Sequence, residues 1–166
     1  LERDIPALEF SLPADKVRRF WMMLTHYHGQ LINLSELGSS LGMSHTTVSD
    51  YIDLLAGTFM VRRLLPWHEN LAKREVKRPK LYFRDSGILH RLLGISSRDT
   101  LLTHPKLGFS WEGFALEQII RRWNAQQEEV FFWQVHQQAE LDLLIFRNAL
   151  LNLPFDRVMV TPDHEN

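Results

Sequence analysis

Residues 34–55, LSELGSSLGMSHTTVSDYIDLL, contain two helix signals separated by a glycine, and this stretch decides the fold of the first half of the chain. Asn33 precedes the stretch and Glu36 follows three residues later, which is the capping-box pattern of a helix start. We therefore predict a short helix over residues 34–41. Gly42 then interrupts the helical pattern, because glycine readily takes the left-handed conformation that ends a helix.

A second helix is predicted directly after this turn. Ser44 is its expected N-cap, because a serine side chain accepts a hydrogen bond from the first helical turn, and the helix should end near Gly57. Another helix is predicted upstream, with Asp15 as N-cap, Lys16 as first residue and Gly29 as its end. The three helices can close a small core through inward apolar residues: Val17, Phe20, Trp21, Leu24, Tyr27, Leu37, Leu41, Val48, Tyr51, Ile52 and Leu55.

After these helices the pattern becomes strand-like. We predict strands over residues 59–66 and 81–83, separated by the polar and basic segment 67–79. The order helix, helix, tight turn, helix, strand, basic loop, strand is typical of a winged helix-turn-helix. The sequence therefore predicts a winged helix over residues 15–84.

Residues 85–166 have the pattern of a small α/β or α+β unit. We expect a loop over 96–110, and we expect Phe114, Ile119 or Ile120, and Trp123 to face inward from the helix that follows the loop. The predicted helices and strands are SGILHRLLG (86–94) and WEGFALEQIIRRW (111–123), then VFFWQV (130–135), LDLLIF (141–146) and RVMVT (157–161).

Composition excludes several classes of protein. The chain has 166 residues, no cysteine and a net charge of −1, so disulfides, cysteine-bound zinc and thiol catalysis are excluded. Its 45% hydrophobic and 23% charged residues are typical of a globular protein. No apolar run approaches the roughly 18 residues of a membrane helix. We expect a cytoplasmic protein with no membrane partner.

Basic charge is concentrated in residues 62–84, which hold eight Lys or Arg and two Glu. Such a wing could contact phosphates, and the third helix could approach a DNA groove through its hydroxyl side chains. That helix contains no Lys or Arg, however, and Asp50 and Asp53 would repel phosphate, so a protein-docking module and a solvated basic loop remain alternatives. The candidate nucleic-acid-binding residues are Thr46, Thr47, Ser49, Lys73, Arg74, Lys77, Arg78 and Lys80.

Carboxylates in the second half form another candidate site. Glu112 and Glu117 lie on one predicted helix, and Glu140 and Asp142 lie two residues apart on one strand and so share a face. A helix carboxylate and a strand carboxylate can together hold Mg²⁺ through oxygen ligands. The alternative is that these side chains are simply solvated. The chain has no GxxxxGK[ST] motif, so we do not expect it to bind ATP by itself.

Three stretches in the same order resemble one family: PKLYFRDSG (79–87), GFSWEG (108–113) and WQVHQQAELDLL (133–144). The chain through about residue 147 resembles the C-terminal region of bacterial AAA-like ATPases, a domain of unknown function. In that family a P-loop ATPase domain precedes this region. The resemblance therefore implies that residues 1–14 are a linker from a missing ATPase domain, which would bind ATP.

The resemblance also implies a restriction-endonuclease-like fold for residues 85–166. Glu112 and Asp142 match the family's catalytic and metal-binding acids, with Glu140 nearby, and Mg²⁺ would bind if the site is intact. The family's E-x-K strand has no match, because the last lysine is Lys106. Either a segment is absent after Asp142 or the site has decayed, and we expect the chain to be inactive by itself.

The sequence thus predicts the DNA-associated region of a bacterial AAA-like ATPase, of class α+β, with a winged helix followed by a nuclease-like domain. Its expected partners are DNA and its own ATPase domain, and homo-oligomers are left open. Two alternatives remain, a Mg²⁺-dependent nuclease and a protein-docking module that does not bind nucleic acid.

Overall fold

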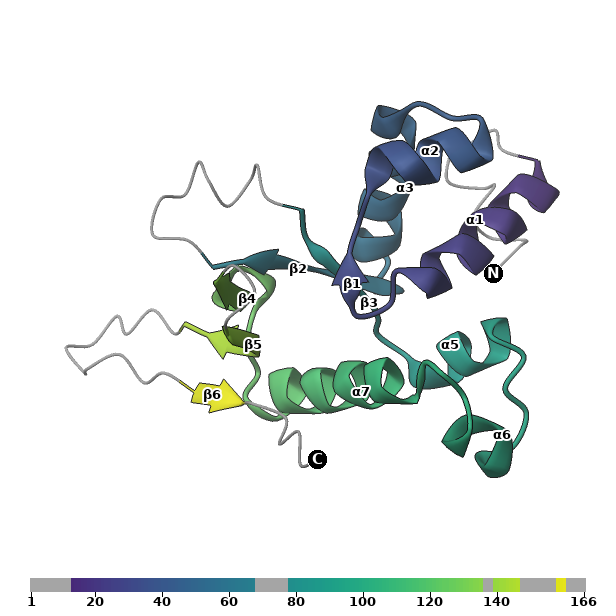
Figure 1. Ribbon diagram of the computed structural model, residues 1–166. Coiled ribbons are helices and arrows are strands. Elements are labelled where there is room, and N and C mark those ends of the chain that lie inside the picture. The colour runs from purple at the N-terminus through teal and green to yellow at the C-terminus, as the bar shows by residue number, and fades with distance from the viewer. Residues whose placement is uncertain (1–12, 68–77, 136–138, 147–157, 161–166) are drawn as a thin grey trace.

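Six β-strands form one mixed sheet through the middle of the protein, and helices lie on both sides of it (Figure 1). The computed structural model describes residues 13–67, 78–135, 139–146 and 158–160, and it confirms the predicted mixture of helices and strands. The strands are β1 (Gln30–Leu31), β2 (Val61–Pro66), β3 (Lys80–Phe83), β4 (Val130–Val135), β5 (Ala139–Ile145) and β6 (Val158–Val160). The helices are α1 (Ala14–His26), α2 (Leu34–Leu41), α3 (His45–Gly57), α5 (Ser86–Leu92), α6 (Arg98–Leu102), α7 (Leu107–Arg122) and the short 3-10 helix η2 (Gln127–Glu129).

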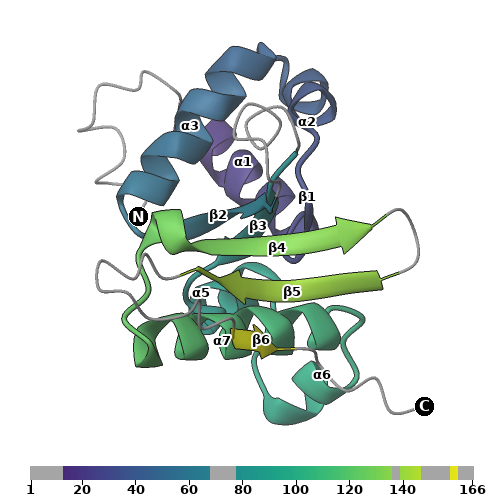
Figure 2. The ribbon, with the colours of Figure 1, turned by 90° about the vertical axis from the view of Figure 1, so that its left-hand side faces the viewer.

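The strands follow the order β1-β3-β2-β4-β5-β6 across the sheet. Neighbours are antiparallel except β2 and β4, which run parallel and pair Leu65 with Phe131. Figure 2 shows β4 and β5 side by side, with α7 alongside them. β2 thus connects the hairpin that it forms with β3 to the C-terminal strands. The sequence pattern did not predict β1.

Strand β3 is covered on both faces, and all four of its residues are buried. Leu81 and Phe83 pack into a core with α1, α2 and α3, whereas Tyr82 packs on the opposite face with residues of α7 and β4. In β2, Val61 belongs to the first core and Leu64 to the second. The division into domains after residue 84 stays a prediction, and the structure adds that β2 and β3 take part in both cores.

The predicted starts and ends of α2 and α3 are confirmed. The Asn33 side chain accepts a hydrogen bond from the Glu36 amide, and the Ser44 side chain accepts one from the Thr47 amide. These caps depend on residues three positions apart, so the local sequence is sufficient to specify them. The prediction for α1 was slightly wrong, because the helix follows Pro13 and Asp15 lies inside its first turn.

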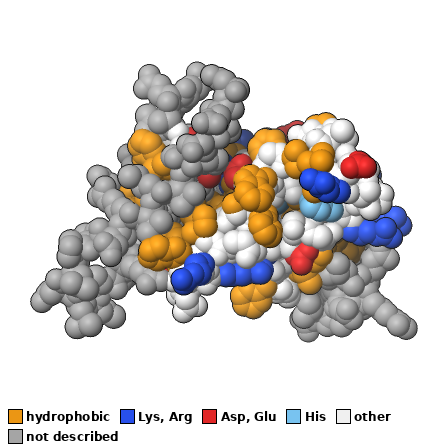
Figure 3. All heavy atoms as spheres, turned by 90° about the horizontal axis from the view of Figure 1, so that it is seen from below, with side chains coloured by type: hydrophobic (Ala, Val, Ile, Leu, Met, Phe, Trp, Pro, Cys, Tyr) orange, Lys and Arg blue, Asp and Glu red, His pale blue; other side chains and the backbone are white. Residues whose placement is uncertain are grey.

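The prediction for residues 96–110 was wrong, since α6 lies within them and α7 begins at Leu107. Two inward assignments were also wrong, because Phe114 is 43% exposed and Trp123 is 39% exposed. Ile120 is buried, as one of the two options held. The buried face of α7 consists of Ser110, Gly113, Leu116, Glu117 and Ile120, so a glycine, a serine and a glutamate disguised it in the hydrophobic pattern. Figure 3, the underside of Figure 1, shows hydrophobic side chains scattered among charged ones.

Four helices end at a residue with left-handed backbone, where glycine is usual because a side chain at positive φ is crowded. Three of these positions hold residues that tolerate the conformation, two glycines and an asparagine, but the one after α3 holds a phenylalanine with φ of 60°. This conformation costs a non-glycine residue about 1 kcal/mol. The four residues are Gly42, Phe59, Gly94 and Asn124.

His28 joins the two halves of the fold. Its Nδ1 accepts a hydrogen bond of 3.0 Å from the Phe83 amide, so its Nε2 carries the proton and donates to the Phe109 carbonyl at 2.9 Å. Gly113 of α7 packs directly on the ring, because a Cβ there would lie 2.7 Å from Nε2. Burial lowers the pKa of His28 to about 4, although the bond to Phe109 acts in the opposite direction.

Stability should therefore fall as the pH is lowered through the range between the pKa values of His28 in the unfolded and folded states. The unfolded state binds a proton near pH 6.5 and the folded state only near pH 4, so the stabilisation by neutral His28 is complete above about 6.5 and is lost toward 4. Between pH 7 and 5 we expect a loss of about 2 kcal/mol in the free energy of unfolding, measured with urea.

The variant His28→Gln should lose this part of the pH dependence. His45→Gln is the matched control, because His45 is exposed on α3 and its replacement should leave the pH dependence unchanged. Equal pH dependence in the wild type and in His28→Gln would contradict the assignment.

Candidate active site around Lys80

Three carboxylates from two elements surround the ammonium group of Lys80. Lys80 Nζ lies 3.1 Å from Asp142 Oδ1 and 3.7 Å from Glu112 Oε1, and it forms an ion pair with Glu140. Lys80 belongs to β3, Glu112 to α7, and Glu140 and Asp142 to β5. The lysine side chain is only 8% exposed, whereas Glu140 reaches the surface at 39%. The site is therefore half open to solvent.

Tyr82 completes the site from the same strand as Lys80. Strand side chains two residues apart share a face, so Lys80 and Tyr82 both point toward α7. The Tyr82 hydroxyl donates a hydrogen bond to Glu112, and the Lys80 ammonium lies 5.4 Å from the ring centre of Phe132. Tyr82 thus orients Glu112 on one side while Lys80 attracts it from the other.

The charges in the site shift its pKa values. Burial raises the pKa of Glu112, as do the neighbouring Asp142 and Glu140, while Tyr82 and Lys80 act against this rise. Burial alone would lower the pKa of Lys80, but the carboxylates outweigh this and the net shift is upward. Burial and then the charge of Glu112 raise the pKa of Tyr82. Lys80 is therefore held as an ammonium ion and Tyr82 as a neutral hydrogen-bond donor.

The arrangement fits an ammonium ion rather than a metal ion. Within the described part of the chain, no group of three or more His, Asp or Glu side chains is spaced to hold a metal. The carboxylates converge on Lys80 Nζ, which takes the central position. We therefore derive no catalytic step through Mg²⁺ from this geometry.

The structure brings together all three acids that the sequence proposed, namely Glu112, Asp142 and the neighbouring Glu140. It also supplies a lysine, which the sequence analysis looked for after Asp142 and did not find. Lys80 was expected on an exposed basic wing, but it is buried at 6% exposure and paired with carboxylates. The overlooked signal was the alternation Lys80, Leu81, Tyr82, which places a lysine and a tyrosine on one face of a strand.

The other candidate nucleic-acid residues lie apart from this site. Thr46 is exposed on α3, and Thr47 and Ser49 are half-buried. The hydroxyls of Thr46 and Thr47 lie 2.7 and 2.8 Å from Ser44 Oγ, so they already belong to the helix cap. Arg78 is exposed. Three further residues, Lys73, Arg74 and Lys77, lie outside the described residues.

The arginines at the start of the basic segment are paired within the fold. Arg62 is 3% exposed and contacts Glu117 through two hydrogen bonds of 2.5 and 3.2 Å. Glu117, itself 2% exposed, also accepts a hydrogen bond from Arg84. Arg63 forms an ion pair with Asp53 of α3. These contacts stabilise the packing of α7 and α3 on the sheet, as one reading of the basic segment had it.

Comparison with known proteins assigns the chain to a family. The model of a family described as "Domain of unknown function (DUF8612)" matches residues 1–99, more than half of the chain. The chain belongs to this family. The match includes Lys80 and Tyr82 and ends before Glu112.

Two mycobacterial relatives extend the similarity through the rest of the site. The chain is 48% identical over 145 residues to the uncharacterized proteins Rv2008c of Mycobacterium tuberculosis and Mb2031c of Mycobacterium bovis. The alignment covers 87% of this chain and 32% of each relative, so the chain spans about a third of their length. No solved structure matches the chain. None of the helices in the described residues has the length and apolar character needed to cross a membrane.

Proposed function

We propose that this chain is the nucleic-acid-associated region of a longer bacterial AAA-like ATP-binding protein. The observation that carries the proposal is the unit formed by α1, α2 and α3 against the β2–β3 hairpin. Helices α2 and α3 are joined by three residues, 42–44, and α3 is capped by Ser44, an order and spacing typical of a helix-turn-helix. The segment between β2 and β3 occupies the position of a wing.

The length of the relatives supports the second half of the proposal. About two thirds of each relative lies outside the match, which is room for a separate ATPase domain of the kind the resemblance implies. In this reading the chain places DNA against that domain, and its basic wing contacts phosphates without reading sequence. The residues proposed for this contact are Lys73, Arg74, Lys77 and Arg78.

Anisotropy of a labelled DNA duplex, measured across a salt series, tests DNA binding. We expect wild-type affinity to fall steeply with salt, because phosphate contacts release counterions. Replacing Lys73, Arg74, Lys77 and Arg78 together by Glu should weaken binding at least about tenfold and reduce the salt slope by about three.

The matched control carries the same change in charge at four exposed residues elsewhere, on α1 and α5: Lys16, Arg18, Arg19 and Arg91. This control should keep most of the wild-type affinity. Equal losses in both variants, or no wild-type binding at low salt, would contradict the proposal and favour a protein-docking module.

A second candidate function is hydrolysis of phosphodiesters, favoured by the Lys80 site. A lysine beside two carboxylates is the residue set that metal-dependent nucleases use, and Lys80, Glu112 and Asp142 lie within 4 Å of a common centre. The carboxylates would have to exchange the ammonium for a divalent cation. The candidate therefore depends on a rearrangement of the Lys80 side chain.

Cleavage of plasmid and single-stranded DNA with Mg²⁺ or Mn²⁺ tests this candidate. Asp142→Asn and Glu112→Gln should each abolish cleavage, whereas Glu36→Gln on the exposed face of α2 should not. Cleavage that survives Asp142→Asn, or none by the wild type with either metal, would exclude the Lys80 site as a nuclease centre in this chain.

A further inference from the structure

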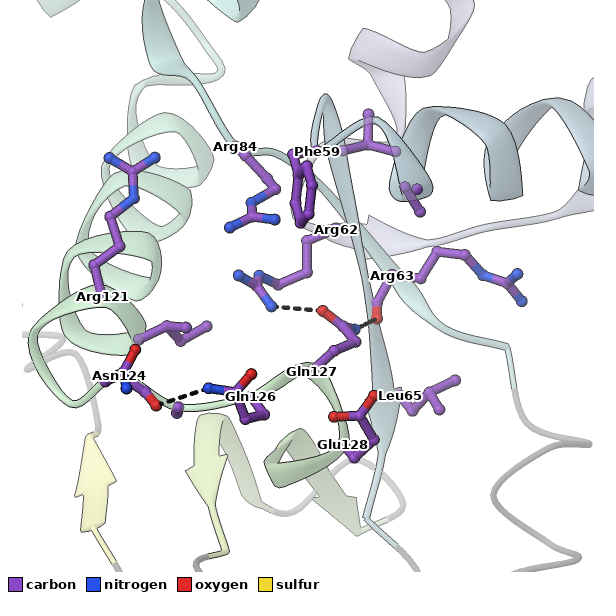
Figure 4. A pocket seen from close by; sticks show the side chains of 15 residues that line it. Phe59, Arg62, Arg63, Leu65, Arg84, Arg121, Asn124, Gln126, Gln127 and Glu128 are labelled. Atoms are coloured by element: carbon purple, nitrogen blue, oxygen red, sulfur yellow. Dashed lines mark hydrogen bonds between the residues drawn. The ribbon is translucent and has the colours of Figure 1, made fainter. Parts of the chain in front are cut away.

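A cleft of about 750 Å³ lies between the end of α3, strand β2 and the end of α7 (Figure 4). It is separate from the Lys80 site, since neither Lys80 nor any of its three carboxylates lines it. Its volume is within the range of pockets that hold small ligands, roughly 300 to 1,000 Å³. The described residues that line it include four arginines and one glutamate, Glu128.

Two of the four arginines are neutralised within the fold. Arg62 is paired with Glu117, and its other end donates a hydrogen bond to Gln127, as Figure 4 shows. Arg63 is paired with Asp53. These two side chains form the wall of the cleft and have no charge left to offer a ligand.

The other two arginines keep donors available. Arg84 uses only its Nε on Glu117, at 3.2 Å, so both of its terminal amino groups remain. Arg121, at the end of α7, is exposed and forms no ion pair with the described part of the chain. Arginine donors of this kind bind phosphate or carboxylate oxygens in pairs. The cleft therefore offers an oxyanion site.

Phe59 provides a second kind of contact at the same place. Its side chain is 71% exposed, and the Arg84 guanidinium lies 5.2 Å from its ring centre. The backbone around it is held by hydrogen bonds from the Phe59 amide to Ala56 and from the Met60 amide to Leu55. Glycine would satisfy both bonds without crowding, as it does after α2 and α5. A phenylalanine here adds an exposed aromatic face and nothing that the turn requires.

We infer that this cleft binds a nucleotide unit, with the phosphate on Arg84 and Arg121 and the base against the Phe59 ring. An aromatic ring beside arginines is the combination that proteins use to stack bases while holding the backbone. An acidic peptide would use the arginines but would leave the ring without a planar partner. The inference does not depend on the proposed roles of α3, the wing or Lys80.

Two probes test the site and distinguish its sources, a fluorescent mononucleotide (N-methylanthraniloyl-AMP) and fluorescein-labelled oligothymidylate of ten residues. Binding of either probe supports the inference. Saturation by the mononucleotide identifies a free nucleotide as the ligand, and binding of the oligonucleotide alone identifies a single strand.

Arg121→Glu should weaken binding at least about tenfold, the loss expected for a charge-assisted phosphate contact. Arg122→Glu is the matched control, because Arg122 is the next residue of α7, is exposed, and does not line the cleft. Its binding should remain within about threefold of the wild type, as expected for a charge that only screens at a distance. Equal losses in the two variants would overturn the inference.

Phe59→Gly separates binding from folding. Because glycine suits the backbone at this position, the midpoint of urea unfolding should stay at or above the wild-type value. Probe binding should nevertheless weaken about tenfold, in keeping with the loss of one base–aromatic stack. Unchanged affinity, a lower unfolding midpoint, or displacement of the probe by inorganic phosphate as readily as by unlabelled AMP would each overturn the assignment.

Discussion

Replacing Glu117 by alanine should lower the free energy of unfolding by about 4 kcal/mol, because it leaves a buried guanidinium without its counter-charge. Arg62 is 3% exposed, and its two hydrogen bonds to Glu117 form its contact with α7. Arg84 also loses its partner, but it is 21% exposed and can turn toward water. The uncompensated charge of Arg62 therefore causes most of the loss.

Urea unfolding followed by tryptophan fluorescence measures this effect. Glu128→Ala is the matched control, because Glu128 lies near the same arginines but is exposed, and its removal should change stability by less than about 0.5 kcal/mol. The double variant Arg62→Met with Glu117→Met should recover most of the loss, since breaking a buried pair costs more than replacing it with apolar side chains. A cost below 1 kcal/mol for Glu117→Ala would contradict the assignment.

Replacing Lys80 by methionine should cost about 3 kcal/mol at pH 7, the low end for a broken buried pair because Glu140 is partly exposed. Methionine keeps the length of the side chain but removes the charge that holds Glu112, Glu140 and Asp142 together. The carboxylates then repel one another, and their pKa values rise in the folded state.

The sign of the pH dependence should separate this variant from the wild type. When a carboxyl has a higher pKa in the folded than in the unfolded state, the folded state binds more protons, so stability increases as the pH falls toward the unfolded value. Between pH 7 and 5, Lys80→Met should therefore lose less stability than the wild type does, or gain some.

A control and a rescue test the cause. Lys16→Met changes the same residue type at an exposed position of α1 and should leave stability and its pH dependence close to wild type. Lys80→Met combined with Asp142→Asn should be more stable at pH 7 than Lys80→Met alone, because one repelling charge is removed. If the double variant is less stable, repulsion among the carboxylates is not the cause.

The local features of the fold were predictable because adjacent residues determine them. The caps of α2 and α3 depend on Asn33 with Glu36 and on Ser44 with Thr47, each pair three residues apart. The strands β2, β3, β4 and β5 follow from short apolar runs between polar segments. Only α6 and the start of α7 were missed, in a stretch of mixed polar and apolar residues.

The candidate sites were predictable only in part. The sequence pointed to Glu112, Glu140 and Asp142 from their places on a helix and a strand, and the structure brings them together. It could not reveal the role of Lys80, because a lysine within a basic run has the pattern of a solvated residue. Phe59 and Arg121 were likewise unremarkable in sequence, since neither residue belongs to a motif.

The sequence by itself determined where helices and strands begin, which residues cap them and which acids could form a site. These properties depend on hydrogen bonds and spacings within a few residues. Only the tertiary structure decided that Lys80 meets Asp142, 62 residues away, and that Arg62 meets Glu117, 55 residues away. Charges at such separations become partners only when β3 and β2 are covered by α7, because burial removes the water that would otherwise solvate each charge separately.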